Sequence, residues 1–378
     1  MVVRNVSRDG DFRGGDGFQH VWRWIKGRFG SAVKDIREVS ARGTLLNLLE
    51  VVNLSVHFDT YEGMVEAVDE ANLTIKAGEI VGLVGESGCG KTTMAHAILN
   101  GIPSPPGKIS KGEIFFQGRD ILQMEERELN SSIRGRAITL IPQDPLGSFN
   151  PLFSIRTQIK DIAGQKFKRQ PEPKRGEDHQ EEMKQKIITM LNRVQLPSPE
   201  NFLRKYPYEL SGGQRQRIMI AIALIADPLL IIADEPTTFL DVTVQAQILQ
   251  ILKRLAGEQR VSVLYITHNL AVASKISHRI VVMYAGQVVE SAPTDSFFSN
   301  PAHPYTSKLL ECLPSYARKI KGIPGDIPSL INPPKGCRFV SRCDRARSQC
   351  SQKRPPREEI ESNHWVSCYE PHTNEGSG

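Results

Sequence analysis

The chain has 378 residues and a formal net charge of +6 at pH 7, with 24% of its residues charged and 39% hydrophobic. This composition is ordinary for a soluble globular protein, and the mild basic excess does not by itself indicate a nucleic-acid partner. The length exceeds one typical domain, so we expect a main unit with a subdomain and at least one appended segment.

The sequence predicts neither a secretory signal nor a membrane-spanning helix. The N-terminus carries Asp9, Asp11 and Asp16 and has no apolar core segment. The longest apolar stretch, residues 218–233, is interrupted by Asp227-Pro228 and is too short to span a bilayer. We therefore expect a cytoplasmic chain that reaches a membrane only through a partner or a surface helix.

Residues 1–44 are predicted to form an N-terminal extension. Residues 1–17 are rich in Gly, Asp and Arg and are expected to be disordered. Apolar residues then recur at three- and four-residue steps over 18–39, with basic residues between them, which predicts a basic amphipathic helix. Two hypotheses stay open for this helix: packing on the main domain, or docking to a membrane surface or partner.

Apolar alternation over 45–75 predicts antiparallel strands, with Tyr61 in a turn between them. An aromatic side chain there is suited to stack on an adenine ring, and an exposed turn tyrosine is the alternative. A buried strand follows and breaks into glycines. Gly85, Gly90, Lys91 and Thr92 have the spacing of a P-loop, whose backbone N–H groups curl around phosphate oxygens.

We expect the P-loop to bind the phosphates of ATP with Mg²⁺. Lys91 would reach the outer phosphates, Thr92 would hold magnesium, and the following helix N-terminus would add its dipole. Cys89 is expected to be a small filler. The nucleotide-binding residues predicted from this loop are Gly85, Ser87, Gly88, Cys89, Gly90, Lys91, Thr92 and Thr93.

Further strands are predicted downstream, and helices alternate with them. A polar helical insertion over about 144–215 indicates a helical subdomain, and the alternation indicates an α/β sheet with its site along one edge. Polar residues end three of these strands. The strands are 137–142 before Gln143, 229–233 before Asp234 and Glu235, and 261–267 before His268, followed by a hairpin over 279–290.

The polar residues at these strand ends are expected to act on the γ-phosphate. Asp234, with Thr92 and Gln143, is placed to hold magnesium, and Glu235 to orient and polarise the attacking water. Gln143 and His268 carry side chains that reach the γ-phosphate or that water. The predicted catalytic residues are thus Glu235, His268 and Gln143.

Residues 210–214 place a serine, two glycines and a glutamine before a long apolar helix, an arrangement typical of a second anion site. Two phosphate-binding edges in one chain are natural if two subunits face head to tail and hold each ATP between them.

The segments GESGCGKTT, LSGGQRQR, ADEPTTFLD and ITHNL, in this order, resemble the ATP-binding subunit of an ABC transporter over about 46–300. The resemblance implies an α/β P-loop ABC ATPase fold over 45–300, with antiparallel β and helical subdomains. It implies that Tyr61 stacks on adenine, Gln143 is the Q-loop glutamine and His268 the switch histidine. It also implies that Ser211, Gly212, Gly213 and Gln214 contact the ATP of the partner. Phe239 departs from the small residue usual at its position.

Residues 301–378 are rich in Pro and Gly and are predicted to be an extended segment laid over the core, rather than a second globular domain. The run Pro-Pro-Lys-Gly-Cys-Arg-Phe, followed by Arg-Cys, resembles the tail of the oligopeptide and dipeptide (nickel) importer branch. Four cysteines here would favour a soft metal in the cytosol: Cys337, Cys343, Cys350 and Cys368.

Two metal sites are considered for these cysteines. Structural zinc usually takes pairs separated by two to four residues, which the tail lacks, whereas a 4Fe–4S cluster tolerates wider spacing. The resembling tails are associated with such a cluster. We therefore favour a structural 4Fe–4S cluster over zinc, with unligated thiols or a disulfide as the third possibility.

The resemblance implies an ATPase subunit at the cytoplasmic face of the cell membrane that energises import of oligopeptides or dipeptides. The implied partners are a second homologous ATPase, forming a heterodimer, two transmembrane permease subunits and an extracytoplasmic solute-binding protein. Oligosaccharide or nickel import is the alternative. A soluble ABC ATPase acting on nucleic acid or ribosomes is more remote, because the chain has neither a long coiled-coil insertion nor tandem cassettes, and we expect no nucleic-acid partner.

Overall fold

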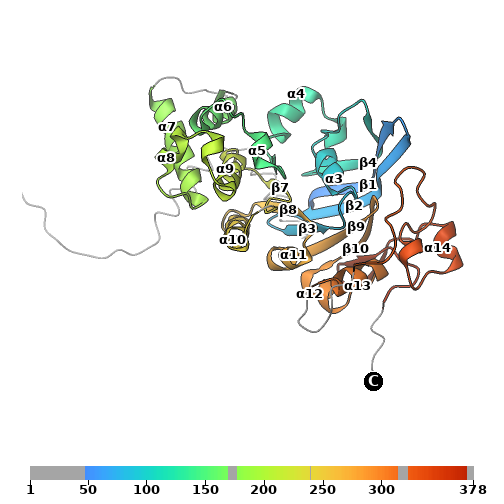
Figure 1. Ribbon diagram of the computed structural model, residues 1–378. Coiled ribbons are helices and arrows are strands. Elements are labelled where there is room, and N and C mark those ends of the chain that lie inside the picture. Colours follow the sequence, from blue (N-terminus) through green and yellow to red (C-terminus); the bar gives the residue numbers. More distant parts are fainter. Residues whose placement is uncertain (1–46, 169–176, 239, 314–321, 373–378) are drawn as a thin grey trace, which may run out of the picture. The chain divides into compact units, whose positions relative to one another are not determined.

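The computed structural model describes residues 47–168, 177–238, 240–313 and 322–372. The predicted N-terminal extension, its amphipathic helix and Phe239 lie outside these residues. Two sheets organise the described part of the chain (Figure 1).

The smaller sheet has four antiparallel strands in the order β2-β1-β4-β5. Burial alternates over residues 49–52 of β1 and 71–76 of β2, where the sheet has one face toward the core, as the apolar alternation predicts. Strands β1 and β2 form a hairpin that closes at Thr60 and Gly63. The strands are β1 (Asn47–Thr60), β2 (Gly63–Lys76), β4 (Gly107–Phe116) and β5 (Arg119–Asp120).

The larger sheet has eight strands in the order β11-β12-β10-β9-β3-β8-β7-β6. The strands from β9 to β6 in this order run parallel, and β3, β7 and β8 are buried along their whole length. The strands are β3 (Ile80–Val84), β6 (Ile138–Ile141), β7 (Leu230–Asp234), β8 (Ser262–Thr267), β9 (Arg279–Tyr284), β10 (Gln287–Pro293), β11 (Glu358–Glu361) and β12 (His364–Val366).

The register of the parallel strands aligns their carboxyl ends. Val84 of β3 is opposite Thr267 of β8, and Asp234 of β7 is opposite Ile266. On the other side of β7, Ala233 is opposite Ile141 of β6. The segments that follow these strands therefore leave the sheet at one edge, where ligands bind in open α/β sheets.

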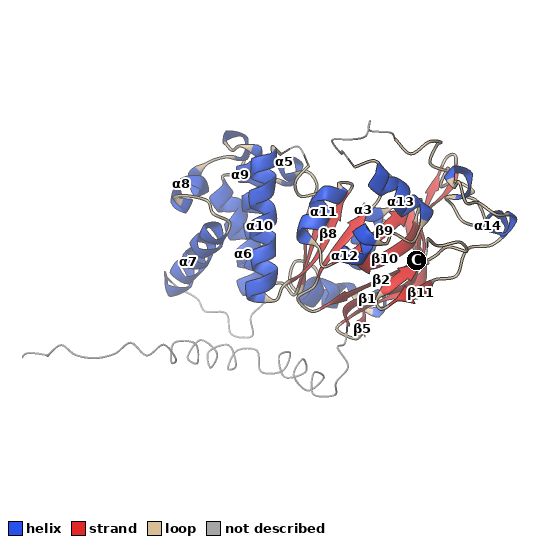
Figure 2. Cartoon of the chain, turned by 90° about the horizontal axis from the view of Figure 1, so that it is seen from below, coloured by secondary structure: helices blue, strands red, loops and turns tan. Residues whose placement is uncertain are grey.

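Helices pack on both sheets and on each other. Figures 1 and 2 show α6 to α9 gathered together near α10, away from β1 and β2. The helices are α3 (Lys91–Ile98), α4 (Glu126–Glu128), α5 (Pro145–Ser148), α6 (Ile155–Lys168), α7 (Glu177–Arg193), α8 (Pro199–Arg204), α9 (Gly212–Ile225), α10 (Val242–Gln259), α11 (Leu270–Ile276), α12 (Thr294–Ser299), α13 (Pro304–Glu311) and α14 (Ser348–Gln352).

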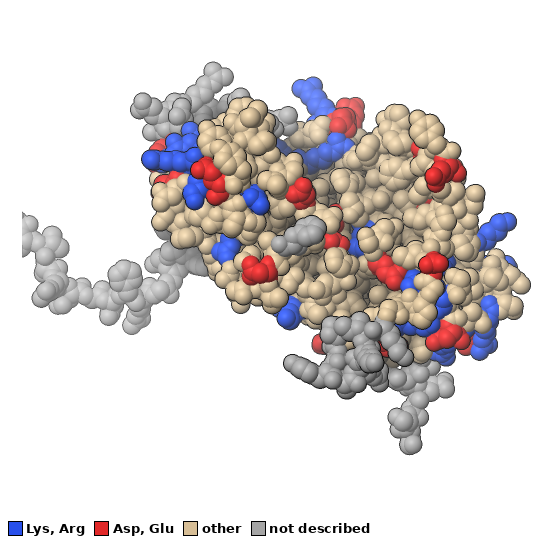
Figure 3. All heavy atoms as spheres, in the orientation of Figure 1, with Lys and Arg blue, Asp and Glu red and all other residues tan. Residues whose placement is uncertain are grey.

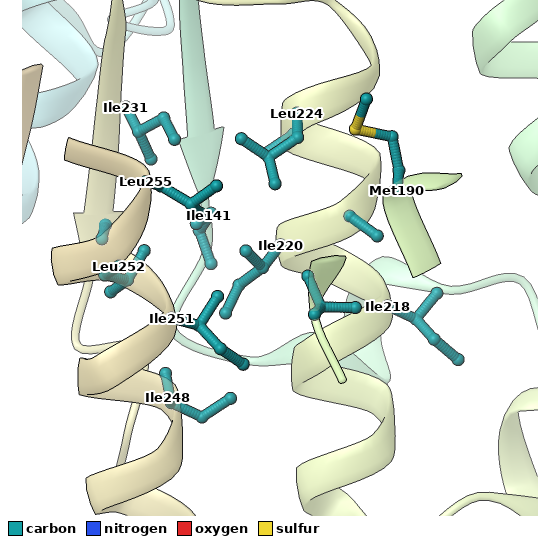
Figure 4. Packing of buried hydrophobic residues seen from close by; sticks show 14 of the residues in the cluster. Ile141, Met190, Ile218, Ile220, Leu224, Ile231, Ile248, Ile251, Leu252 and Leu255 are labelled. Carbon is teal, nitrogen blue, oxygen red and sulfur yellow. The ribbon is translucent and has the colours of Figure 1, made fainter. Parts of the chain in front are cut away.

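One apolar cluster joins the helical group to the large sheet. Ile220 and Leu224 of α9 approach Ile251 and Leu255 of α10, with Ile231 of β7 beside them (Figure 4). All are nearly fully buried. Each contributes about 1.5–3 kcal/mol by burial, so this cluster fixes the helical group against the strands that carry the site.

The tail differs from the predicted extended segment, because it adds two strands to the large sheet. Val366 and Trp365 of β12 pair with Glu290 and Ser291 of β10, and β11 pairs with β12. Without β12, the outer backbone donors and acceptors of β10 would be unpaired at a sheet edge. The predicted core fold, with an antiparallel β part and a parallel α/β part, is confirmed.

In the part of the chain that the structure describes, every helix is too short or too polar to cross a membrane. On the face shown in Figure 3, Lys and Arg side chains lie among Asp and Glu side chains.

Candidate functional site

The loop between β3 and α3 can form only with glycine at two of its positions. A Cβ atom at Gly85 would lie 2.1 Å from the Met283 carbonyl oxygen, and one at Gly90 would lie 2.3 Å from that of Ala67. Gly90 also has a φ of +102°, which side chains disfavour. The loop therefore passes tightly against β2 and β9, with Ser87 and Gly88 exposed to the pocket.

Lys91 opens α3 and is almost completely buried. Its Nζ atom donates to the carbonyl oxygens of Gly85 and Glu86, at 2.9 Å each. Cys89 lies beneath the loop, 3.7 Å from the same Nζ atom, and burial raises the pKa of its thiol. Cys89 thus fills space under the loop. The ammonium group of Lys91 lies at the base of the same loop and supplies its positive charge.

Asp234 ends β7 as a nearly buried carboxylate beside the start of α3. Burial raises the pKa of this carboxyl, and a hydrogen bond from the Thr92 side chain opposes the rise. The Oδ1 atom of Asp234 is buried without a hydrogen-bond partner. A buried unsatisfied carboxylate oxygen next to a threonine hydroxyl fits a hard cation that prefers oxygen ligands, such as Mg²⁺.

Glu235 is the point where three polar side chains converge. Its Oε1 atom lies 2.9 Å from Nδ1 of His268, and its Oε2 atom accepts from Nε2 of Gln143 at 3.2 Å and from Oγ1 of Thr238 at 3.0 Å. Glu235 has a φ of +45°, and its backbone N–H donates to the Ile266 carbonyl. A non-glycine residue in this strained conformation is typical of functional sites.

Apart from Cys89 and Asp234, the site residues described above line one pocket of about 910 Å³. The structure thus brings the predicted P-loop residues together with Gln143, Glu235 and His268, and Asp234 borders them through Thr92. Thr238 was not predicted from the sequence, although its position three residues after Glu235 is a signal for such a contact. The apolar wall of the pocket was not predicted either; it is formed by Phe58, Val65, Ala67, Leu270, Leu309 and Leu330.

Six of the predicted nucleotide-binding residues do not line this pocket: Tyr61, Cys89, Ser211, Gly212, Gly213 and Gln214. Tyr61 is fully exposed in the turn between β1 and β2, whereas Phe58 lines the pocket. Ser211 caps α9: its Oγ accepts from the backbone N–H of Gln214 at 3.3 Å, and the Gln214 side chain accepts from the Ser211 N–H at 3.0 Å. This reciprocal capping box satisfies two N–H groups at the helix start.

The four tail cysteines Cys337, Cys343, Cys350 and Cys368 line a second, smaller pocket together. Burial raises the pKa of Cys337 to about 11 and that of Cys368 to about 12, and the neighbouring cysteines act in the same direction. The Cys337 N–H donates to the Cys350 carbonyl at 2.7 Å. Among the residues that the structure describes, no three His, Cys, Asp or Glu side chains are close enough together to hold a metal ion as they stand.

Comparison with protein families gives two matches along the chain. Residues 68–238 match the family model described as "ABC transporter", and residues 289–350 match "Oligopeptide/dipeptide transporter, C-terminal region". The first match contains the P-loop and Glu235. The second contains three of the four tail cysteines.

Whole-length relatives agree with these matches. The chain is 41% identical over 326 residues to the oligopeptide transport ATP-binding protein OppD of Bacillus subtilis, covering 85% of this chain and 88% of the relative. It is 38% identical over 332 residues to the dipeptide transport ATP-binding protein DppD of Escherichia coli, covering 86% and 97%.

Among solved structures, the chain is similar to MJ0796, described as a dimeric bacterial ABC transporter cassette, with a TM-score of 0.57 and 29% identity. The match covers 65% of this chain and 98% of the cassette. A second structure of that cassette, a post-hydrolysis state bound to ADP and Pi, matches equally well.

Proposed function

Because the chain belongs to the ABC transporter family, among the ATP-binding subunits with an oligopeptide/dipeptide transporter C-terminal region, we propose that it energises import of oligopeptides or dipeptides. The observation that carries this proposal is that one chain joins a pocket lined by the P-loop, Gln143, Glu235 and His268 to a tail that matches the oligopeptide/dipeptide transporter C-terminal region. Its relatives in Bacillus subtilis and Escherichia coli are oligopeptide and dipeptide transport ATP-binding proteins, which supports peptide as the cargo.

In ATP binding, the backbone N–H groups of the P-loop and the Lys91 ammonium hold the phosphates. The Thr92 hydroxyl and the Asp234 carboxylate, whose Oδ1 atom is buried and unpartnered, would hold Mg²⁺, together with Gln143. When bound there, Mg²⁺ neutralises charge on the β- and γ-phosphate oxygens. The apolar wall at Phe58 would bind the adenine. Tyr61 would move toward the pocket from the β1–β2 turn and stack on the same ring.

In hydrolysis, Glu235 orients and polarises the attacking water. Its carboxylate is held by three contacts, from His268, Gln143 and Thr238, so little rearrangement is needed when ATP binds. His268 is half exposed and faces the pocket, where it can reach the γ-phosphate. Gln143 follows β6 and precedes the helical group, so it links the site to elements suited to contact a permease.

The segment at the start of α9 would complete the ATP site of a second subunit, through Ser211, Gly212, Gly213 and Gln214. Their distance from the pocket of their own chain supports this role, because a helix N-terminus that does not serve its own nucleotide is available to another. We propose a head-to-tail pair in which the partner is a homologous but different ATPase.

We further propose that Cys337, Cys343, Cys350 and Cys368 hold a 4Fe–4S cluster as a structural staple. The chemistry of the donors supports this proposal, because all four thiols line one pocket and two accept backbone hydrogen bonds, from Arg347 N–H at 3.5 Å and Glu370 N–H at 3.3 Å. To bind a cluster the thiols would have to approach one another more closely than in this structure. Such bonds to sulfur are usual around clusters. Zinc is the alternative.

The cargo would cross through two separate permease subunits, after delivery by an extracytoplasmic solute-binding protein. The ATPase would then lie at the cytoplasmic face of the membrane as a peripheral subunit. Closure of the ATPase pair on ATP, and reopening after hydrolysis, would bias the permease between two states.

Purification of the complex from the native membrane under anaerobic conditions tests this function. Mass spectrometry should identify two multispanning permease chains and a second ATPase, and purified complex in vesicles should import a peptide in an ATP-dependent manner. Recovery of the chain on ribosomes or DNA without a permease would contradict the transport assignment. Import of nickel or an oligosaccharide instead of peptide would contradict only the cargo.

A further inference from the structure

Two buried arginines of the tail lie next to its cysteines and form ion pairs with carboxylates of the ATPase core. Arg338 follows Cys337, and Arg342 precedes Cys343. Arg338 is 2% exposed and Arg342 8% exposed. Buried guanidinium groups are costly unless every donor is paired, so the partners of each arginine show what it holds in place.

Arg342 forms a two-pronged ion pair with Glu86, a P-loop residue. Its Nη1 atom lies 2.9 Å from Oε2 of Glu86, and its Nη2 atom 3.1 Å from Oε1. Its other hydrogen bonds go to the Tyr284 hydroxyl at 3.2 Å and to the carbonyls of Pro324 and Ile323, both at 3.1 Å. All three guanidinium nitrogens are paired, which fixes the orientation of the fork.

Glu86 transmits this contact to the phosphate-binding loop. Its carbonyl oxygen accepts from Lys91 Nζ at 2.9 Å and from the Cys89 N–H at 3.3 Å. Its own N–H donates to the Tyr305 hydroxyl at 3.1 Å, and Tyr305 belongs to α13 in the tail. One residue of the loop, Glu86, is thus held by the tail through its side chain and its N–H, while its carbonyl positions the phosphate-binding Lys91.

The tail surface that holds Glu86 is itself rigidly packed. Phe339 lies between the two arginines in the sequence. Its ring packs edge-on against Tyr284, with ring centroids 5.2 Å apart, and at a tilt against Tyr305, with centroids 5.3 Å apart. Phe339 and both tyrosines are buried. Aromatic rings in such a cluster have little freedom, so Arg342 is presented to the loop from a fixed support.

From these contacts we propose that Arg342 is a positioning residue for ATP binding, which sets the P-loop geometry by holding the Glu86 carboxylate from the tail. The proposal deepens the ATPase function and rests on it. It does not depend on what the four cysteines bind. An ABC cassette of this kind would therefore bind ATP with full affinity only when its own tail is docked.

The test compares variants of the full-length chain by ATP affinity, ATPase kinetics and melting temperature. Arg342→Ala and Glu86→Gln should each raise the Kd and the KM for ATP about tenfold or more, while kcat at saturating ATP stays close to that of the parent. Arg342→Lys should recover part of the affinity, because a lysine can make one of the two contacts that Arg342 makes with the Glu86 carboxylate. The double variant should bind ATP no more weakly than the worse single variant, since both remove one interaction.

Arg354→Ala is the matched control. Arg354 is likewise a tail arginine paired with core carboxylates, Asp69 and Glu70, although it is less buried than Arg342; it does not touch the P-loop and does not line the nucleotide pocket. It should lower the melting temperature without changing the Kd for ATP. If Arg342→Ala does not fold, the isosteric Glu86→Gln variant still decides the matter.

Three outcomes would overturn the proposal: an unchanged Kd in Glu86→Gln, an equal rise in Kd in Arg354→Ala, or fully additive effects in the double variant. A parent chain that fails to bind ATP at all would instead contradict the ATPase function.

Discussion

The Oε1 atom of Glu235 lies 2.9 Å from Nδ1 of His268, although the two residues are 33 positions apart in the chain. They follow neighbouring parallel strands, β7 and β8, whose register brings both to one edge. An imidazole N–H at this distance can donate a hydrogen bond to the carboxylate and so hold it in one orientation toward an attacking water.

Replacement of Glu235 by Gln is expected to lower kcat by about 10²–10⁴-fold, the usual contribution of general acid–base catalysis. The amide keeps the shape of the side chain but does not polarise the water, so ATP binding should persist and a closed pair should accumulate. Steady-state ATPase assays and equilibrium ATP binding on the same sample provide the check. Turnover close to that of the parent would show that Glu235 does not have this role.

Replacement of His268 by Ala is expected to lower kcat about 10²-fold, the usual cost of losing one preorganised contact to a developing charge. Its side chain is 55% exposed, so the melting temperature should change little. Thr238→Val is a useful comparison, because it removes another contact of the Glu235 carboxylate without removing a group that reaches the phosphate. An equal loss in both variants would indicate that His268 acts only by orienting Glu235.

Replacement of Lys91 by Met is expected to weaken ATP binding, because the stem remains while the cation is lost. A charge-assisted hydrogen bond contributes about 1.5–3 kcal/mol, so the Kd for ATP should rise about 10- to 100-fold. Calorimetric titration with a non-hydrolysable ATP analogue measures this directly. Wild-type affinity in the Met variant would place the phosphates elsewhere.

Replacement of Tyr61 by Ala tests whether the exposed hairpin aromatic stacks on adenine. Loss of one base–aromatic stack costs about 1–3 kcal/mol, or about 5- to 100-fold in Kd. Because Tyr61 is fully exposed, the Tyr61→Ala variant should have the melting temperature of the parent. The Tyr61→Phe variant keeps the aromatic ring and should bind ATP normally. Phe58→Ala is the counterpart: Phe58 also packs on the apolar core, so its loss should lower stability as well. An unchanged Kd in Tyr61→Ala would leave Phe58 as the adenine platform.

Anaerobically purified protein is expected to contain about four irons and four acid-labile sulfides per chain, as one cubane cluster requires. Cys343→Ser should lower the iron content, whereas Cys312→Ser, outside the four-cysteine pocket, should not. One equivalent of zinc would favour the alternative metal. Absence of both metals would refute a metal site in the tail.

The residues that meet in the pocket could be placed from the sequence because their signals are local. Glycine spacing, the lysine and the strand before it define the P-loop at 80–93, and residues that follow buried strands meet because parallel strands share a direction. Gln143, Glu235 and His268 were predicted on this ground, and the structure brings their side chains into contact.

The contacts of the tail could not be predicted in the same way. Arg342 and Glu86 are 256 residues apart, and neither position has a periodic or motif signal for the other. The Pro- and Gly-rich composition indicated an extended segment, yet β12 pairs with β10, because an open sheet edge recruits any strand that fits it. Such pairing depends on where the folded core places the open edge of β10, and the composition of the tail does not encode that position.

The addition of β12 and β11 also changes which strand ends the large sheet. The outermost strand is now β11, where Glu358, Glu359 and Glu361 stand on a four-residue strand with exposed side chains. A short edge rich in carboxylates repels another copy of itself and resists pairing with foreign strands. The tail thereby replaces the longer, buried β10 with an edge that protects the protein against edge-to-edge aggregation.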